Sequence, residues 1–182
     1  MPPPAITLDA LCSPAQRAQL NQMHKAVGYG WKGHQHIPRF LPHIRTLKCK
    51  TLLDYGCGKG NMAMQMKLDA PDIDVRLFDP GHLPVSDLPE PADYVSCCSC
   101  LEGVEPDKLD NVLEHLYMLA LKGAYFAICI RLGKKNDLPD GRNEHLSVHP
   151  PEWWITKLIA VGWSVMQVDT DDPKFLKVWL ER

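Results

Sequence analysis

A glycine-rich turn between a predicted strand and a predicted helix constrains this fold more than any other feature of the chain. The apolar run 51–53 is typical of a buried strand, and 61–67 has the composition of a helix. Between them, residues 56–60 read Gly-x-Gly-x-Gly. Glycine allows unusual torsion angles and lets a ligand approach the backbone closely. The pattern therefore predicts a strand, a turn and a helix N-terminus that cradle a nucleotide-like ligand.

Two acidic residues sharpen this prediction. Asp54 ends the first strand, where a carboxylate suits a ligand with a cationic amino-acid end better than a pyrophosphate. Asp79 ends the next predicted strand, 73–78, and its two oxygens can accept hydrogen bonds from both hydroxyls of a ribose. A dinucleotide is the alternative ligand, although the spacing here is not Gly-x-Gly-x-x-Gly. The turn resembles motif I of class I S-adenosylmethionine (SAM) methyltransferases.

Composition limits the classes of protein that the chain can belong to. Its 182 residues suffice for one domain with a substantial core, and a formal net charge of −2 gives no general attraction to nucleic acid. No apolar run approaches the roughly 20 residues of a membrane span, and the N-terminus does not read as a signal peptide. The seven cysteines favour reduced thiols, and their spacing predicts no metal site. We therefore expect a cytoplasmic protein that does not bind membranes.

Strands and helices alternate along the chain, which predicts an α/β fold with a parallel sheet and crossover helices. Predicted strands cover 51–53, 73–78, 92–98, 124–130, 163–168 and 175–180, the last two as an antiparallel pair, and predicted helices cover 13–27, 38–47, 61–67, 106–121 and 151–161. Only the 13 residues 79–91 separate the second strand from the third, and several are proline. A helix–strand–helix unit cannot fit there. The usual Rossmann-like methyltransferase sheet is therefore predicted to be trimmed by one strand.

Several motifs together resemble a family of short methyltransferases from bacteria and bacteriophages. They are Leu-Asp-Tyr-Gly-Cys-Gly-Lys-Gly at 53–60, Phe-Asp-Pro at 78–80, Pro-Glu-Pro-Ala-Asp-Tyr-Val at 89–95, Leu-Glu-Gly-Val-Glu-Pro at 101–106 and Leu-Pro-Asp-Gly-Arg-Asn-Glu-His-Leu at 138–146. The likeness implies a class I fold with SAM as cofactor and S-adenosylhomocysteine (SAH) as product, and it names no acceptor. Where that family usually reads Asp-Val-Leu-Glu-His, this chain has Ser99, Cys100 and Gly103 at the Asp, Val and His positions.

The predicted cofactor site lies beyond the carboxyl ends of the strands, where open α/β sheets bind ligands. Its residues are Asp54, Gly56, Cys57, Gly58, Gly60, Asp79, Cys98, Ser99, Leu101 and Tyr29. Those that follow the third strand are expected to line the methionine and methyl region. Tyr29 belongs to 1–46, which we predict to be an N-terminal tail and helical lid over a SAM-binding domain, 47–182. Closing a lid would exclude water and align the methyl group with its nucleophile.

The long loop predicted at 131–149 supplies the catalytic candidates. It follows the carboxyl end of a strand, and loops of this length are usually functional or disordered. Arg142 and His145 are predicted to act on a polar acceptor, with His145 taking its proton near neutral pH. The alternative is that both residues only hold the loop through hydrogen bonds. Cys98 or Cys100 could be a nucleophile, although a small thiol there more often serves packing.

These predictions combine into SAM-dependent methyl transfer to an O or N nucleophile of a small molecule such as a sugar or nucleotide. No Asn/Asp-Pro-Pro-Tyr/Phe motif follows the strand at 92–98, which argues against methylation of the amino group of adenine or cytosine. A nucleic-acid or protein methyltransferase is one alternative. Its basic patch would consist of Arg131, Lys134, Lys135 and Arg142. A non-catalytic SAM-binding module is the other alternative.

Overall fold

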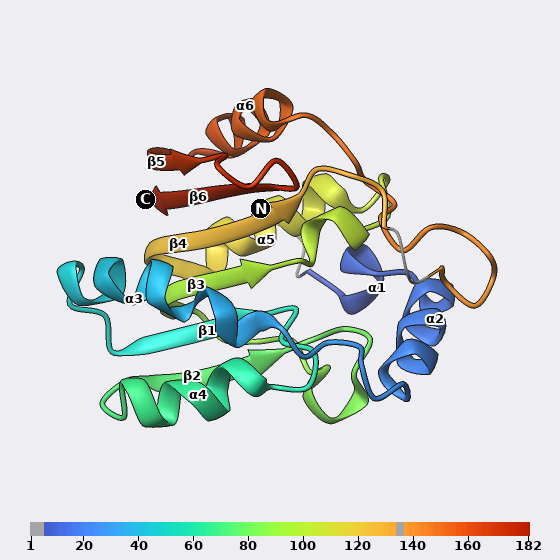
Figure 1. The fold of residues 1–182 in the computed structure, drawn as a ribbon, viewed down its shortest axis with the longest axis horizontal. Helices are drawn as coiled ribbons and strands as arrows, with labels where there is room; N and C mark the ends of the chain where they lie inside the picture. Colours follow the sequence, from blue (N-terminus) through green and yellow to red (C-terminus); the bar gives the residue numbers. More distant parts are fainter. Residues whose placement is uncertain (1–5, 134–136) are drawn as a thin grey trace.

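The computed structural model describes residues 6–133 and 137–182, in which a single six-stranded sheet runs through the molecule (Figure 1). The strands are β1 (Thr51–Tyr55), β2 (Asp74–Phe78), β3 (Ala92–Cys98), β4 (Ala120–Cys129), β5 (Ser164–Asp169) and β6 (Phe175–Glu181), in the order β2-β1-β3-β4-β6-β5. The first four are parallel, and β6 pairs antiparallel with both β4 and β5. The predicted Rossmann-like α/β class, with one strand fewer than usual, is confirmed.

Helices cover both faces of this sheet (Figure 1). They are α1 (Leu8–Leu11), α2 (Pro14–His24), α3 (Ile37–Thr46), α4 (Asn61–Asp69), α5 (Leu109–Leu119) and α6 (Pro151–Val161), with short 3-10 turns η1 (Gly33–His36), η2 (Leu83–Val85) and η3 (Leu101–Gly103). Successive strand residues point to opposite faces, so Leu53 packs with α5 and α6 while Leu52 packs with α3 and α4. The sheet is thus the middle layer between two apolar clusters.

Several element boundaries differ from those predicted. The helix predicted at 106–121 spans only Leu109–Leu119, because Ala120 already pairs with Ala92 in the sheet and begins β4. The helix predicted to run to Val27 ends at His24. Within the predicted N-terminal tail, residues 8–11 form α1, because its Leu11 buries its side chain in the cluster around α5. Tertiary packing and sheet pairing decide these ends, where local propensity is weak.

Contacts far apart in the sequence hold the N-terminal helices against the rest of the molecule. The Ser13 hydroxyl caps α2 by accepting a hydrogen bond from the Gln16 N–H at 3.1 Å. Ser13 in turn donates its own N–H and O–H to the Glu105 carboxylate, at 2.8 and 2.6 Å. Pro14 follows as the first helical residue, where its missing N–H costs nothing. As a result, α2 lies beside the carboxyl ends of the parallel strands (Figure 1).

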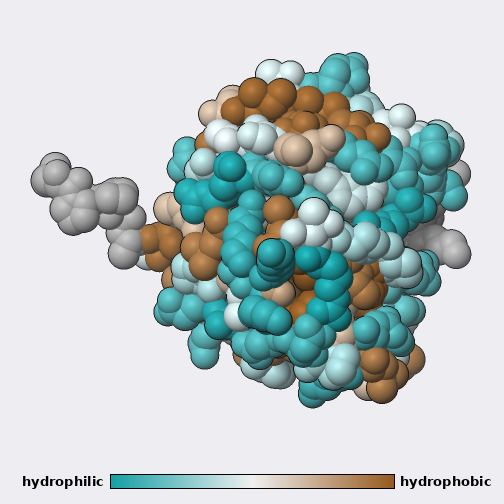
Figure 2. All heavy atoms as spheres, turned by 90° about the vertical axis from the view of Figure 1, so that its left-hand side faces the viewer, coloured by the Kyte–Doolittle hydropathy of each residue, from teal (hydrophilic) through white to brown (hydrophobic). Residues whose placement is uncertain are grey.

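The opposite end of the molecule is mainly hydrophilic (Figure 2). Apolar side chains gather at the top of that view, in the region of α6 and β5. These two elements carry three large apolar residues that are exposed, Ile159, Met166 and Val168. Among the described residues, none of the helices combines the length and the apolarity that crossing a membrane requires.

Candidate active site

A cavity of about 310 Å³ lies at the carboxyl ends of β1 and β3. Its floor is formed by the turn after β1, the residues after β3 and Asp79 after β2, and its walls by parts of the segment 11–36 and by Glu144 and His145. This is the edge of the sheet where the sequence predicts the ligand site. Of the predicted cofactor residues, Asp54, Gly56, Cys57, Gly58, Asp79, Cys98, Ser99 and Tyr29 line it.

The glycine turn has the tight geometry that its sequence indicates. Gly56 and Gly58 have φ of 78° and 54°, in the left-handed region that favours glycine. A Cβ on Gly56 would lie 2.5 Å from Cys100 Sγ, and one on Gly58 would lie 2.5 Å from the Gly30 carbonyl oxygen. Gly60 is the N-cap of α4 and is not among the residues that line the cavity. The turn therefore brings bare backbone to the cavity wall.

Asp79 holds this turn as well as facing the cavity. Its Oδ2 accepts a hydrogen bond from the Gly58 N–H and its Oδ1 one from the Gly81 N–H, both at 2.9 Å. His24 Nε2 lies 3.6 Å from Oδ1. An ionised carboxylate has about four acceptor positions, so two remain for a ligand after these two bonds. Asp79 can therefore clamp the turn and bind ribose hydroxyls at once.

Asp54 is a buried carboxylate with no cationic partner among residues 6–133 and 137–182. It is 3% exposed, and the Ser96 hydroxyl is 3.4 Å from its Oδ1. Burial raises the pKa of Asp54 to about 7, and the negative charge of Asp79 adds to that rise. A ligand that brings an ammonium group into the cavity would stabilise the ionised form of this carboxylate.

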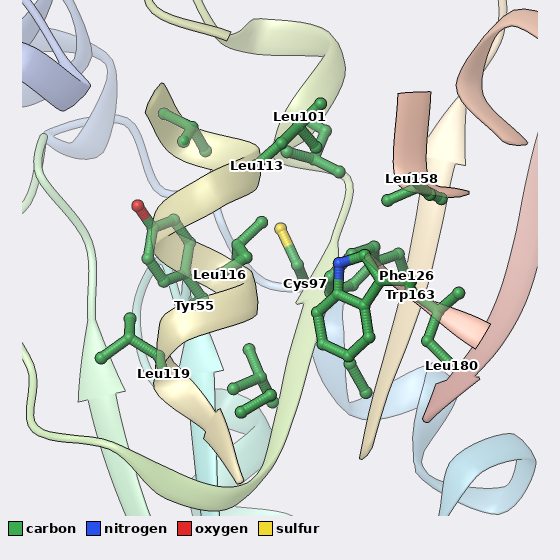
Figure 3. Close-up of a cluster of buried hydrophobic side chains, with 14 of the residues drawn as sticks. Tyr55, Cys97, Leu101, Leu113, Leu116, Leu119, Phe126, Leu158, Trp163 and Leu180 are labelled. Carbon is green, nitrogen blue, oxygen red and sulfur yellow. The ribbon is translucent and has the colours of Figure 1, made fainter. Parts of the chain in front are cut away.

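The residues after β3 divide between the cavity and the core. Cys98 and Ser99 line the cavity, and Ser99 has φ of 53°, unusual for a residue other than glycine. Leu101, in contrast, is 1% exposed and packs in the core (Figure 3). Figure 3 shows it beside Leu113 of α5, so Leu101 supports the cavity floor from behind instead of lining it.

The segment before η1 crosses the glycine turn. The Lys59 N–H donates to the Gly30 carbonyl at 3.1 Å, and the Lys59 ammonium donates to the Ala26 carbonyl. Tyr29 meets the ring of His24 edge-on at a centroid distance of 5.0 Å. These contacts place backbone and side chains of the segment over the glycine turn at the carboxyl edge of the sheet, where the predicted lid would lie.

His145 faces the far end of the cavity. Its Nδ1 lies within hydrogen-bond distance of the Arg131 carbonyl, which can only accept, so in the neutral ring Nδ1 carries the proton and Nε2 the lone pair. Nε2 lies 4.0 Å from Glu102 Oε1 and 4.0 Å from Glu144 Oε1. Burial raises the pKa of Glu102 to about 7. Sequence reasoning missed Glu102, although it lies within the Leu-Glu-Gly motif after the third strand.

Arg142 lies outside the cavity lining. It donates to the Gln16 side-chain carbonyl at 3.0 Å and forms an ion pair with Asp140 at 2.8 Å. These bonds tie the 137–149 loop to α2, which is the loop-holding role that the sequence analysis gave as the alternative to catalysis.

Two of the four residues of the predicted basic patch, Lys134 and Lys135, lie outside the described residues. Trp154 is fully buried in the core, and Trp153 stacks on His149 at a centroid distance of 3.6 Å.

Solved structures identify the fold. The 1,6-didemethyltoxoflavin N1-methyltransferase of Burkholderia thailandensis, solved with 1,6-didemethyltoxoflavin and SAH, is 15% identical over 100% of this chain and 93% of its own, with a TM-score of 0.66. Human N-acetylserotonin methyltransferase in complex with SAM is 14% identical over 97% of this chain and 60% of its own, with a TM-score of 0.61. An O-methyltransferase family protein from Burkholderia thailandensis is 14% identical over 95% of this chain and 63% of its own, with a TM-score of 0.60. The chain thus spans about three fifths of the length of the last two.

The sequence itself matches no family model and no curated protein. The structural likeness is nevertheless extensive, because it covers nearly all of this chain in each of these three structures. The protein has the fold of the class I SAM-dependent methyltransferases. The predicted family resemblance is confirmed at that level, and its bacterial or bacteriophage origin stays a prediction.

Proposed function

We propose that this protein is an enzyme that transfers the methyl group of SAM to an O or N nucleophile of a small molecule and releases SAH. One observation carries the proposal. A cavity at the carboxyl edge of a methyltransferase sheet is walled by a bare glycine turn, by Asp79 and by the buried Asp54. Two carboxylates and exposed backbone match a ligand that has a ribose at one end and an ammonium at the other.

The proposed cofactor pose follows from these groups. Asp79 accepts the two ribose hydroxyls, and Asp54 receives the ammonium of the methionine part, directly or through water. Cys98 and Ser99 border the methyl region, and Tyr29 covers the cofactor from the lid segment. Leu101 and Gly60 contribute by shaping the floor and the start of α4.

The acceptor is proposed to bind at the end of the cavity formed by Glu102, Glu144 and His145. The free lone pair on Nε2 of His145 can take a proton from an O–H or N–H nucleophile as the methyl group transfers. Arg142 would act by holding this loop against α2. His145→Ala is expected to lower the methyl-transfer rate by about 10²–10⁴-fold while SAM affinity stays unchanged. Normal turnover in this variant would remove His145 from the mechanism.

A small acceptor is favoured over a macromolecule. The cavity is about 310 Å³ and is walled by the segment 11–36, which leaves little room for a polymer. Two of the similar enzymes are named for the methylation of 1,6-didemethyltoxoflavin and of N-acetylserotonin, both small molecules. The formal net charge of −2 supports the same choice.

The seven cysteines are free thiols, which supports a reducing compartment such as the cytoplasm.

Titration calorimetry with SAH tests the proposal, with NAD as the matched control ligand. We expect SAH to bind and NAD to give no heat. Binding of NAD without SAH would overturn the proposal in favour of a dinucleotide site. If SAH binds but SAM is not consumed with any of a panel of hydroxyl and amine acceptors, the chain is a binding module and not an enzyme.

A further inference from the structure

We propose that Glu102, Cys129 and His145 form a binding site for one divalent metal ion, of the zinc type, at the acceptor end of the cavity. A carboxylate oxygen, the Sγ and an imidazole nitrogen of these residues all lie within 4.8 Å of one another. They come from three parts of the fold, η3, the end of β4 and the loop before α6. All three residues line the same cavity, so an ion held between them would face a bound acceptor.

The orientation of His145 suits metal binding. Its Nδ1–H donates to the carbonyl of Arg131, which fixes the tautomer and aims the Nε2 lone pair toward Glu102. Metal-binding histidines commonly donate their second ring N–H to a backbone carbonyl in this way, because the bond fixes the ring and raises its basicity. The 4.0 Å between Nε2 and Glu102 Oε1 is close to the roughly 3.3 Å that separates two ligands on one tetrahedral zinc ion.

Glu102 provides an independent reason to expect a ligand here. The residue is 2% exposed, and neither of its carboxylate oxygens accepts a hydrogen bond of good geometry among the described residues. The backbone N–H groups of Glu102 and Cys129 lie close enough only to offset part of the rise in its pKa that burial causes. A buried carboxylate with no partner is costly, and proteins normally pair such groups or use them to coordinate metals. A divalent cation would satisfy both oxygens.

The chemistry of the three ligands selects the type of ion. A thiolate, an imidazole and a carboxylate are the ligands of zinc sites, whereas magnesium and calcium prefer oxygen alone. One thiolate and one carboxylate carry two negative charges, which balance a divalent cation. Three protein ligands leave a fourth position for water or substrate, as in catalytic zinc sites. Glu144 Oε1 lies 4.0 Å from His145 Nε2, so a further carboxylate borders the proposed site.

This inference rests on the proposed methyl transfer, and it adds that the acceptor has a group able to coordinate a metal ion. An acceptor O–H or N–H bound at the open position would have a lower pKa, because the cation stabilises the anion, and its proton would pass to solvent. The resulting O or N anion would form its bond to the methyl carbon as the bond from that carbon to the sulfonium sulfur breaks. His145 would then serve as a ligand in place of a direct proton acceptor. Acceptors able to coordinate zinc would be preferred.

Metal binding can be measured without a known acceptor. Purified, chelator-treated protein would be titrated with Zn²⁺ against a chromophoric chelator, and its Co²⁺ form examined for thiolate-to-cobalt absorption. We expect one ion per chain and thiolate ligation. Cys129→Ser and Glu102→Gln should each weaken Zn²⁺ binding by about 10-fold or more. The matched control is Cys49→Ser, because Cys49 is also buried but packs in the cluster with α3 and α4, away from the cavity.

The measurements distinguish failure of the metal site from loss of the fold and from failure of the methyltransferase assignment. Absence of a bound ion in the wild-type protein, or equal Zn²⁺ affinity in Cys129→Ser and Cys49→Ser, would overturn the metal site. Circular dichroism and melting curves on each variant show whether a loss of metal reflects a loss of fold, and Glu102→Gln provides a second, nearly isosteric test. SAH titration of the same samples separates the two proposals. SAH binding without Zn²⁺ binding rejects the metal site alone, and Zn²⁺ binding without SAH binding rejects the methyltransferase assignment.

Discussion

At the scale of single residues, buried carboxylates define this site. Asp54, Asp79 and Glu102 are 3, 7 and 2% exposed and line one cavity. Only Asp79 accepts hydrogen bonds from backbone N–H groups at both oxygens, whereas Glu102 has none among the described residues. Burying charged groups is costly without partners. The three carboxylates therefore differ in what they still need: hydroxyl donors at Asp79, a cation at Asp54 and at Glu102.

Asp79→Ala should weaken SAH binding by about tenfold or more, because two ribose hydroxyls lose an acceptor and hydrogen bonds to charged groups are worth roughly 1.5–3 kcal/mol. The Gly58 and Gly81 N–H groups lose the same acceptor, so some loss of stability should accompany it. Calorimetry and a melting curve measure the two effects. Asp74→Ala, at an exposed carboxylate on β2, is the control. Unchanged SAH affinity in Asp79→Ala would take this residue out of the site.

SAH affinity should rise with pH, and Asp54 is the cause. Its pKa of about 7 in the folded protein is above the ordinary 3.8, so the free protein holds a proton there that the unfolded chain would release. This group therefore stabilises the fold less as pH rises from about 4 to 7. A ligand ammonium favours the ionised carboxylate, so binding below pH 7 must expel that proton.

We expect SAH affinity to increase by about tenfold or more from pH 5 to pH 7 and then to level off, with a slope of at most tenfold per pH unit. Calorimetry in buffers of different ionisation enthalpy should detect the released proton. Asp54→Asn removes the titrating group while keeping the shape of the side chain. A pH dependence that survives in Asp54→Asn would assign the effect to a group other than Asp54.

At the scale of elements, the glycine turn and the segment before η1 form one structural unit. The turn is tied to the end of β2 by hydrogen bonds from the Gly56 and Cys57 N–H groups to the Phe78 carbonyl, at 2.7 and 3.1 Å. It is tied to the N-terminal segment through Lys59 and Gly30. Any movement of the segment before η1 would therefore be coupled to the shape of the glycine turn through backbone contacts.

Gly58→Ala should disrupt this unit in two ways. Alanine at φ of 54° is strained by roughly 1 kcal/mol, and its Cβ would lie 2.5 Å from the Gly30 oxygen, so the N-terminal segment must shift. We expect weaker SAH binding and faster proteolysis near residues 25–33. Gly141→Ala, at φ of 85° with no atom within 4 Å of the new Cβ, isolates the torsional strain and serves as the control. Equal SAH affinity in the two variants would show that Gly30 and Gly58 do not shape the site.

At the scale of the whole molecule, ligand binding and stability must be linked. A ligand that binds only the native state at 100 times its Kd stabilises it by about 2.7 kcal/mol. For a domain of this size, each kcal/mol shifts the melting temperature by about 2–4 °C, so saturating SAH should raise it by roughly 5–10 °C. Differential scanning fluorimetry measures the shift. The same SAH concentration should produce a smaller shift in Asp79→Ala, and an equal shift in that variant would contradict the proposed pose.

Much of this fold follows from local sequence patterns. Strand, turn and helix at the glycine motif were predictable because torsional freedom and apolar periodicity act over a few residues. The trimmed sheet followed from chain length alone, since 79–91 is too short for another crossover unit. Positions where local signals compete were less predictable. Ala120 can extend a helix or begin a strand, and only its pairing with Ala92 decides between them.

The sequence by itself determined the class of fold and the edge of the sheet where the cavity lies, because Asp54, Gly56–Gly60 and Asp79 belong to local motifs at strand ends. Only the tertiary structure decided which side chains meet at the end of the cavity beside Glu144. Glu102, Cys129 and His145 are distant in the chain and have no shared spacing, and they converge because β3 and β4 are neighbours in the sheet and the following loop folds back over their ends. The direction of Leu101 into the core and of Arg142 toward α2 was decided in the same way, since burial and hydrogen-bond partners for these side chains exist only once the layers pack.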